Sequence, residues 1–212
     1  IANFFPKNKY FGLLLYKELE NLKRALENPK KPFTAIIGGA KVSGKIDVIQ
    51  SLFNKVDNLI IGGGMAYTFA KAVGGSIGKS LVEDDKLDLA RKLIAESKEK
   101  GVNLILPIDS VNANRFNNDA KIIKSNISNI NQEYMGLDIG AKSIEKFSEI
   151  ILKSKTIVWN GPMGVFEMQN FQAGTKLVGE AICRATKNGA FSLVGGGDSV
   201  SAVNQFKFSK EI

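Results

Sequence analysis

Five compact apolar runs, each ending abruptly in glycine or proline, most constrain how this chain can fold. The runs are FTAIIGG (33–39), NLIIGGG (58–64), NLILP (103–107), TIVWNGP (156–162) and FSLVGGG (191–197). Their apolar residues are consecutive rather than alternating, which is typical of strands buried on both faces of a parallel sheet. Helical patterns separate the runs, at residues 45–55, 66–73, 84–100, 143–152 and 173–187. This alternation predicts an α/β fold with a doubly wound, Rossmann-like open parallel sheet and helices on both faces.

Other patterns flank or interrupt this core. An amphipathic helix is predicted at 13–27, and residues 200–206 have a helical pattern. The stretch 112–135 is less regular, with a short strand expected at 121–124.

We expect residues 1–10 to form an incoming segment and residues 11–212 to form one domain. The chain begins with Ile1 rather than Met and stops after its last helical pattern without a closing strand. We therefore expect it to be a piece of a longer protein.

Residue usage limits the available chemistry. The 212 residues include no histidine, the commonest general base and metal ligand, so catalysis would need lysine, carboxylate or backbone amides. The single cysteine, Cys183, lies in a helical pattern and is expected to be buried. One cysteine excludes an internal disulfide framework and suits a reducing compartment. The apolar runs are far shorter than the ~18 residues of a membrane span.

The excess of basic residues favours anionic partners. Twenty-nine Lys and Arg against 21 Asp and Glu give a net charge of +8. Nucleic acid, an acidic membrane surface and phosphorylated small molecules are the candidate classes. The lysines are scattered singly along helical patterns and are not interleaved with aromatic residues, as a strand-binding groove requires. A solvated lysine surface explains most of the excess, and a basic binding domain for RNA is an alternative.

The motif GGAKVSGK follows the first predicted strand. Its residues Gly39 to Lys45 match the first seven positions of a P-loop, but Ile46 stands where a Ser or Thr hydroxyl should reach magnesium. If Ser43 caps the next helix, Lys41 and Lys45 crowd a positive helix end, which is unfavourable unless an anion shares the site. A P-loop NTPase and a plain turn with solvated lysines are the alternatives.

Three further glycine-rich junctions end strands. Residues 62–64 are three glycines, which fit a flat ligand or a closely packed backbone. WNGPMGVFE (159–167) is expected to present apolar side chains and the carboxylate of Glu167 to a purine and its ribose. GGGDS (195–199) offers amides to phosphoryl oxygens and Asp198 to a divalent cation. Taken singly, each carboxylate could be an ordinary loop or capping residue.

Parallel strands bring all these junctions to one edge of the sheet. Lysines for phosphate, a carboxylate for magnesium and apolar loops for a base would meet there. This combination predicts a nucleotide site that supports phosphoryl transfer by positioning and electrostatics.

Six motifs together resemble those of a known family. GGAKVSGK, LIIGGGMAYTF, IGKSL, MGLDIG, VWNGPMGVFE and GGGDS resemble, in the same order, the C-terminal, nucleotide-binding half of phosphoglycerate kinases. The resemblance covers the chain from residue 11 onward. It implies one domain of a two-domain kinase, which reversibly transfers a phosphoryl group between 1,3-bisphosphoglycerate and ADP, giving 3-phosphoglycerate and ATP in glycolysis. It also implies a Mg²⁺ cofactor and a cytoplasmic monomer without nucleic-acid or membrane partners.

The resemblance also implies roles for individual residues. Lys41 is similar to the lysine that stabilises the phosphoryl group in flight, and Gly196 and Gly197 to the amides that face it. Asp198 is similar to the magnesium ligand. The full set implied to bind the nucleotide is Gly39, Ala40, Lys41, Lys45, Gly62, Gly63, Gly64, Leu81, Gly136, Leu137, Asn160, Pro162, Val165, Glu167, Gly196, Gly197, Asp198 and Ser199.

The chain departs from the family pattern in three ways. Family members usually have Asp where this chain has Gly44, and this change creates the partial P-loop match. The half that holds phosphoglycerate and the C-terminal glycine-rich segment have no counterpart in these 212 residues. We therefore expect the chain to bind ADP or ATP with magnesium but not to complete the transfer alone.

Overall fold

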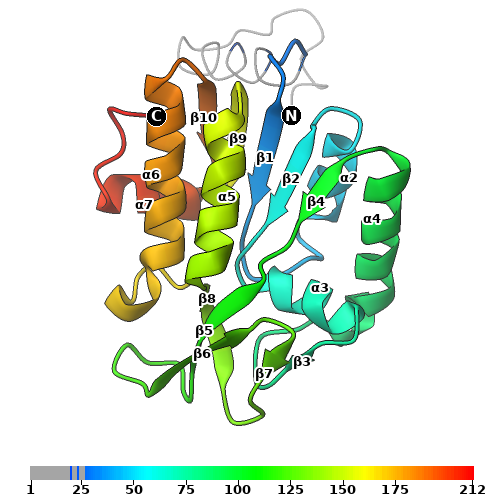
Figure 1. Cartoon of the computed structure of the whole chain (residues 1–212), viewed down its shortest axis with the longest axis vertical. Coiled ribbons are helices and arrows are strands. Elements are labelled where there is room, and N and C mark those ends of the chain that lie inside the picture. Colours follow the sequence, from blue (N-terminus) through cyan, green and yellow to red (C-terminus); the bar gives the residue numbers. More distant parts are fainter. Residues whose placement is uncertain (1–19, 21–22, 24–26) are drawn as a thin grey trace, which may run out of the picture.

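The computed structural model describes Glu20, Lys23 and residues 27–212. The predicted helix at 13–27, apart from these two residues and Glu27, and the segment 1–10 lie outside the described residues. The centre of the structure is a five-stranded parallel sheet in the order β10-β9-β1-β2-β4 (Figure 1). Its strands are β1 (Phe33–Ile37), β2 (Asn58–Ile61), β4 (Asn103–Ile105), β9 (Thr156–Asn160) and β10 (Phe191–Gly195).

The strand order reverses beside β1. The chain runs from β1 outward through β2 to β4, and then returns to place β9 and β10 on the other side of β1. Ile37, the last residue of β1, therefore pairs with Ile61 of β2 on one side and with Asn160 of β9 on the other. Ligands of open parallel sheets bind beyond the carboxyl ends of the strands at such a reversal.

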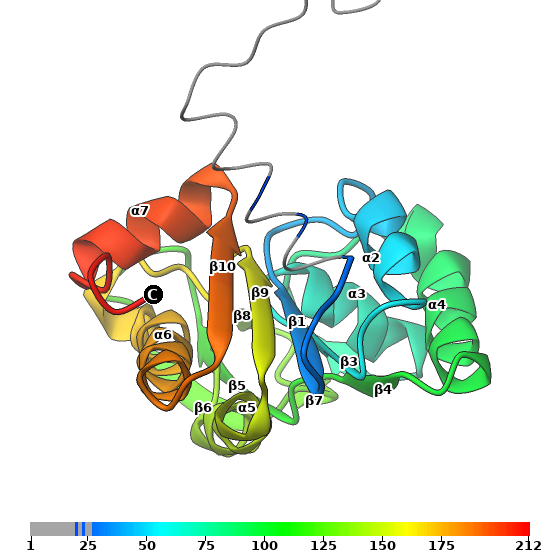
Figure 2. The ribbon, with the colours of Figure 1, turned by 90° about the horizontal axis from the view of Figure 1, so that it is seen from above.

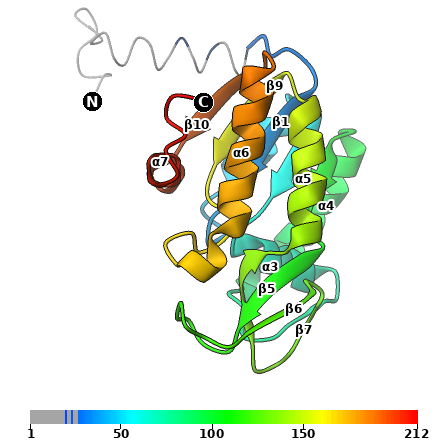
Figure 3. The ribbon, with the colours of Figure 1, turned by 60° about the vertical axis from the view of Figure 1, so that its left-hand side comes forward.

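Helices cover both faces of the central sheet. Alternate β1 side chains enter two cores: Phe33, Ala35 and Ile37 belong to one, and Ile36 belongs to the other. The helices α2, α3 and α4 lie on the first side, and α5, α6 and α7 on the second (Figure 2). Figure 3 shows α5 and α6 side by side across β9 and β10. The helices are α2 (Ile46–Leu52), α3 (Met65–Ala72), α4 (Leu87–Glu99), α5 (Ala141–Lys153), α6 (Ala173–Lys187) and α7 (Gly197–Gln205).

The predicted fold class is confirmed, with adjusted boundaries. All five apolar runs form the parallel strands, and the glycines and prolines that end the runs turn the chain beyond the strands, apart from Gly195, which is the last residue of β10. The predicted helix at 45–55 is shorter, since α2 covers only Ile46–Leu52. Cys183 is buried, as predicted.

The sequence patterns did not predict most of a small antiparallel sheet. Its order is β6-β5-β8, formed by Ile122–Asn126, Asp109–Ala113 and Met135–Ile139. A separate parallel pair joins β3 (Ser76–Ile77) to β7 (Asn129–Ile130). Figure 1 shows these strands below the central sheet, at the end toward which β1 and β2 point. The expected strand at 121–124 corresponds to β6, but the rest of 112–135 is more regular than expected. Exposed and partly buried residues alternate along β6, so it contains no continuous apolar run.

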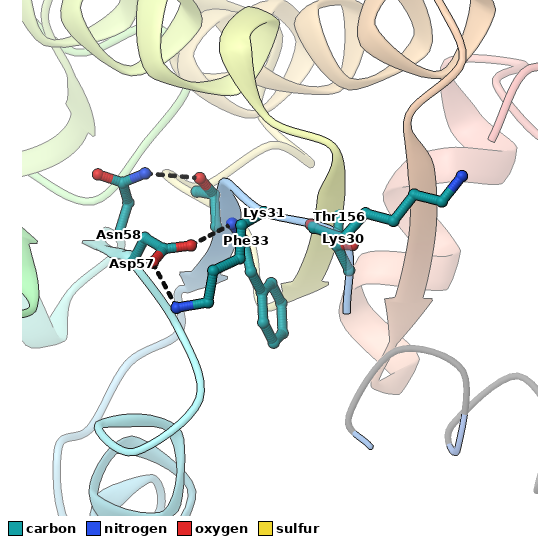
Figure 4. A network of polar contacts seen from close by, with 7 residues as sticks. Lys30, Lys31, Phe33, Asp57, Asn58 and Thr156 are labelled. Carbon is teal, nitrogen blue, oxygen red and sulfur yellow. Dashed lines mark hydrogen bonds and ion pairs between the residues drawn. The ribbon is translucent and has the colours of Figure 1, made fainter. Parts of the chain in front are cut away.

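The opposite, amino edge of the sheet is held by polar contacts (Figure 4). Asp57, just before β2, accepts hydrogen bonds from Lys31 Nζ at 2.8 Å and from the Phe33 N–H at 2.7 Å. Thr156 Oγ1 donates to the Lys30 carbonyl at 2.8 Å. Partial burial acts to raise the pKa of Asp57, but the hydrogen bonds from Lys31 and Phe33 outweigh it and hold the pKa below its usual value. These contacts tie the segment before β1 to both neighbouring strands, far from the glycine-rich loops.

None of the helices in the described part of the chain has both the length and the apolarity needed to cross a lipid bilayer.

Candidate functional site

A cavity of about 630 Å³ lies at the carboxyl edge, beside the reversal in strand order. One wall comes from the loops after β1, β2 and β9, and another from the small antiparallel sheet and the segment after β3. Its lining residues are Gly39, Ala40, Gly63, Gly64, Tyr67, Lys79, Leu81, Phe116, Met135, Gly136, Leu137, Pro162, Met163, Gly164, Val165, Glu167, Met168 and Asp198.

Glycine allows three loops to pack backbone against backbone at this edge. A Cβ on Gly38 would lie 2.1 Å from the Pro162 carbonyl oxygen, and one on Gly161 would lie 2.2 Å from the Gly38 oxygen. Gly63 has a positive φ of 69°, and a Cβ there would lie 2.5 Å from the Gly39 nitrogen. Hydrogen bonds join the loops: the Gly63 N–H donates to Met163 O and the Gly38 N–H to Asn160 O. Of the two explanations for the three glycines at 62–64, a flat ligand or a closely packed backbone, the packed backbone is therefore correct at Gly63.

The WNGPMGVFE loop is fixed at successive positions. The Gly161 N–H donates to Ser199 Oγ of α7 at 2.6 Å, and the Met163 N–H donates to Thr175 Oγ1 of α6 at 3.0 Å. The Val165 N–H donates to the Leu137 carbonyl of β8 at 2.9 Å. The loop therefore joins α6, α7 and the small sheet, and its conformation does not depend on a ligand.

The prediction that this loop presents its apolar side chains was wrong for Phe166, and Met163 borders the cavity from within the core. Met163 and Phe166 are almost fully buried and pack in the core beneath α6 and α7. The sulfur of Met163 also fills the space against Gly62, where a Cβ would lie 2.3 Å away from it. Val165 and Glu167 remain at the cavity.

Lys45 is directed across the sheet edge by Asn160. Lys45 Nζ donates a short hydrogen bond to Asn160 Oδ1, at the end of β9. The same Asn160 amide lies beside the backbone of Gly195 and Gly196, since Cβ atoms built there would come within 3.3–3.7 Å of it. One side chain thus connects the loop after β1 with the loop after β10. Lys41 is exposed, and no ion pair with a carboxylate holds it within the described part of the chain.

The condition that Ser43 caps α2 is not met. The helix starts at Ile46 with Lys45 in the capping position. Ser43 is instead bound to Glu83: its N–H donates to Oε2 at 3.0 Å and its hydroxyl to Oε1 at 2.5 Å. Burial acts to raise the pKa of Glu83, but these hydrogen bonds outweigh it and lower the pKa. With seven residues and no hydroxyl at Ile46, α2 does not provide the phosphate site of a P-loop.

The start of α7 offers backbone donors to the site. Gly196 adopts a positive φ of 89°, which turns the chain from β10 into the helix. Within the described residues, no side chain caps the first amides of α7. Gly197 and Asp198 are exposed there, and Asp198 also lines the cavity. Ser199 is buried, and its hydroxyl oxygen accepts a hydrogen bond from the Gly161 amide.

The donor set suits a magnesium ion that arrives with a nucleotide. No group of three or more His, Cys, Asp or Glu residues able to hold a metal occurs among the described residues. Mg²⁺ needs no such cage, because it usually retains waters and binds one or two carboxylates together with substrate phosphates. Asp198 supplies one carboxylate at the cavity edge, beside the uncapped amides of α7.

Two buried titratable groups support the walls of the cavity. Tyr67 lines the cavity and its hydroxyl is 2.8 Å from Ser110 Oγ; burial raises the pKa of this phenol despite the hydrogen bond, so Tyr67 stays neutral. Asp138 accepts the N–H groups of Ile139 at 2.9 Å and Gly174 at 2.7 Å. Burial raises the pKa of Asp138 to about 7, although both N–H donors oppose the rise.

Eleven of the predicted nucleotide-binding residues line the cavity together: Gly39, Ala40, Gly63, Gly64, Leu81, Gly136, Leu137, Pro162, Val165, Glu167 and Asp198. The other seven do not line it: Lys41, Lys45, Gly62, Asn160, Gly196, Gly197 and Ser199. Most of the second group lie at the adjoining edge between the loop after β1 and the start of α7, where phosphates would extend from the cavity. The binding roles of both groups remain predictions.

Seven lining residues were not singled out from the sequence: Tyr67, Lys79, Phe116, Met135, Met163, Gly164 and Met168. Five of them lie inside the quoted motifs. The motifs therefore indicated these residues, although none of the five was chosen as a predicted binding residue. Phe116 and Met168 lie outside every motif. Phe116 reaches the cavity from the β5–β6 loop, and no sequence pattern indicated the position of that loop.

Comparison with known proteins identifies the family. The family model for phosphoglycerate kinase matches residues 1–212. The chain belongs to the phosphoglycerate kinase family. It is 58% identical over 213 residues to a phosphoglycerate kinase of Porphyromonas gingivalis, which covers 100% of this chain and 51% of that protein. It is 54% identical over 192 residues to one of Chlorobium phaeobacteroides, covering 91% of this chain and 48% of the relative.

Solved phosphoglycerate kinases share the fold. The structure from Coxiella burnetii matches with a TM-score of 0.91 and 43% identity, over 95% of this chain and 51% of that chain. The structure from Pyrococcus horikoshii matches with a TM-score of 0.78 and 28% identity, over 92% of this chain and 49% of that chain. The chain thus spans about half the length of the phosphoglycerate kinases it matches. Family membership replaces the P-loop NTPase alternative.

Proposed function

We propose that this chain provides the nucleotide site for reversible phosphoryl transfer between 1,3-bisphosphoglycerate and ADP, which yields 3-phosphoglycerate and ATP. The observation that carries the proposal is the position of the cavity. It lies at the strand-order reversal, and residues of all six glycine-containing motifs line it. The phosphoglycerate site belongs to the half of the family's length that this chain does not span.

The base and ribose bind in the cavity, and the phosphates bind along the adjoining edge. The apolar wall that includes Tyr67, Leu81 and Leu137 takes the purine, and Glu167 accepts hydrogen bonds from the ribose hydroxyls. Lys45, held by Asn160, binds the phosphates as they pass toward α7. Among carboxylates at this edge, Asp198 is the proposed ligand of Mg²⁺.

The remaining groups act on the transferred phosphoryl group. Negative charge on that group is stabilised by the Lys41 ammonium and by the Gly196 and Gly197 amides at the positive end of α7. Because Lys41 is exposed and not held by a carboxylate in the described structure, it can follow the group during transfer. The magnesium ion, when bound, neutralises charge on the phosphate oxygens.

The remaining proposals follow from the family's place in glycolysis. We expect the protein to act as a monomer in the cytoplasm, with ADP or ATP as ligand and without a nucleic-acid or membrane partner. Isolated from a phosphoglycerate-binding half, the 212 residues bind nucleotide but do not turn over, since the second substrate has no site.

Titration calorimetry with Mg-ADP tests nucleotide binding, and a coupled kinase assay run beside it tests the absence of turnover. We expect saturable binding of one Mg-ADP and no turnover by the chain alone. Absence of Mg-ADP binding would overturn the proposed nucleotide site. Robust turnover by these 212 residues would instead show that the second half is not needed.

A further inference from the structure

We propose that Lys79 enables the site to bind, in addition to ADP, nucleotides whose purine base carries an oxygen at position 6. This inference rests on the proposed nucleotide site. Lys79 lines the cavity beside Leu81 and Met135, within the apolar wall assigned to the base. Among the residues that line this cavity, all of them described, Lys79 is the one cation.

The backbone of Lys79 is fixed against the opposite segment of the wall. Its N–H donates to the Tyr134 carbonyl at 2.8 Å, and the Gly136 N–H donates to Ser80 Oγ at 2.9 Å. Gly78 precedes it with a positive φ of 56°, and a Cβ there would lie 2.3 Å from the Tyr134 oxygen. Lys79 therefore emerges from a rigid turn, at a defined position beside the base.

The Lys79 ammonium can leave its present partner at little cost. Lys79 Nζ pairs with Glu133 Oε2 at 2.6 Å, but the two side chains are 50% and 75% exposed. Exposed ion pairs of this kind contribute little to the stability of the folded state, because water competes for both charges. Rotation of the side chain from Glu133 toward a bound base is therefore accessible.

The chemistry of the ammonium group decides which base it favours. Lysine offers three N–H donors and no acceptor. Guanine and hypoxanthine present two acceptors on one edge, N7 and O6, whereas adenine presents N7 beside an amino donor. Lys79 can thus satisfy both groups on a 6-oxopurine, but on adenine it meets a second donor.

Calorimetric titration of the 212-residue chain with Mg-ADP, Mg-GDP and Mg-IDP tests this selection. Lys79→Met removes the charge at similar length, Lys79→Arg keeps the donors, and Lys100→Met at the exposed end of α4 is the matched control. We expect Lys79→Met to weaken Mg-GDP and Mg-IDP binding by about 5- to 10-fold, with Mg-ADP nearly unchanged. Lys79→Arg and Lys100→Met should keep the order of the three affinities.

The alternative outcomes separate this inference from the nucleotide site itself. An equal loss for all three nucleotides, or no loss for any, would overturn base selection while leaving the site intact. A loss for Mg-GDP with none for Mg-IDP would also overturn it, because both bases share the oxygen at position 6. If the unsubstituted chain bound none of the three, the proposed function would fall as well. Far-UV circular dichroism checks that each variant is folded.

Discussion

Single side chains at the carboxyl edge link loops that are distant in the sequence. Asn160 receives Lys45 across 115 residues and lies beside the backbone after β10. Each of these two residues would be read separately as a ligand contact from its motif. The structure adds a contact between them, because the amide oxygen of Asn160 accepts a hydrogen bond from the Lys45 ammonium.

Replacing Asn160 tests this positioning role. Asn160→Ala leaves Lys45 free to rotate, so we expect the Kd for Mg-ADP to rise by about tenfold, equivalent to ~1.4 kcal/mol. Lys45→Ala should cost at least as much, and the double variant should lose less than the sum, because the two residues act as a unit. A calorimetric double-mutant cycle measures this coupling, with Asn188→Ala at the exposed end of α6 as control. Strict additivity would contradict the positioning role.

The buried carboxyl of Asp138 makes stability depend on pH. Its folded-state pKa of about 7 lies above the unfolded value of about 3.9, so the folded state holds the proton more tightly between these values. Stability from this group is fully present below about pH 4 and is lost as the pH rises through 7. We expect the free energy of unfolding in urea to fall more between pH 5 and pH 8 for the natural chain than for Asp138→Asn. Direct NMR titration of the Asp138 carboxyl gives the same pKa without the variant, and a value near 4 would contradict this account.

Among the elements, the glycine-rich turns show which glycines the fold requires. A Cβ at Gly38 would lie 2.1 Å from a backbone oxygen, whereas nothing lies within 4 Å of the position at Gly44. Both glycines belong to the same motif, and the sequence alone does not distinguish them. Only the crossing of the loops after β1 and β9 does so.

These two positions make a matched pair of variants. Gly38→Ala forces two backbones apart, so we expect a loss of ~1–3 kcal/mol in unfolding free energy and weaker Mg-ADP binding. Gly44→Ala should leave both quantities nearly unchanged. Urea denaturation and calorimetry on the two variants measure the contrast. Equal effects at both positions would mean that the close approach of the two loops is not the reason why position 38 requires glycine.

Strands with continuous apolar runs were predictable, and strands of mixed composition were not. Side chains of β1, β2, β4 and β9 enter the cores on both faces of the sheet, and the half-buried edge strand β10 has the same apolar pattern. In contrast, β5 and β6 mix polar and apolar residues, and their pairing depends on contacts between separate segments. Phe116, on the loop between them, therefore went unnoticed although it lines the cavity. The motifs identified the site's neighbourhood, but which residues line it depends on tertiary packing.

At the scale of the whole molecule, the cavity is lined by several separate parts of the fold. Its walls come from loops of the central sheet and from the small antiparallel sheet, with α7 at its edge. A ligand that contacts all of them binds the folded state and not the unfolded chain.

Binding should therefore raise the stability of the whole chain. At a free Mg-ADP concentration 100 times Kd, we expect the unfolding free energy to increase by about 2.7 kcal/mol. Chelation of magnesium with EDTA should reduce this increase, since phosphate charge would no longer be neutralised near Asp198. Urea unfolding with and without Mg-ADP measures the effect. No change at saturating nucleotide would contradict binding at a site shared by several elements.

The reversal in strand order also sets when the site can exist during synthesis. The central strand, β1, is made before its neighbour β9 and the edge strand β10, which follow more than a hundred residues later in the chain. At about 5–20 residues per second, β1 and its two lysines wait several seconds for these partners. A nascent chain that ends before α7 has neither the amides of its first turn nor the Ser199 hydroxyl that fixes Gly161. Nucleotide can thus assist the folding of this domain on the ribosome only after α7 has been made.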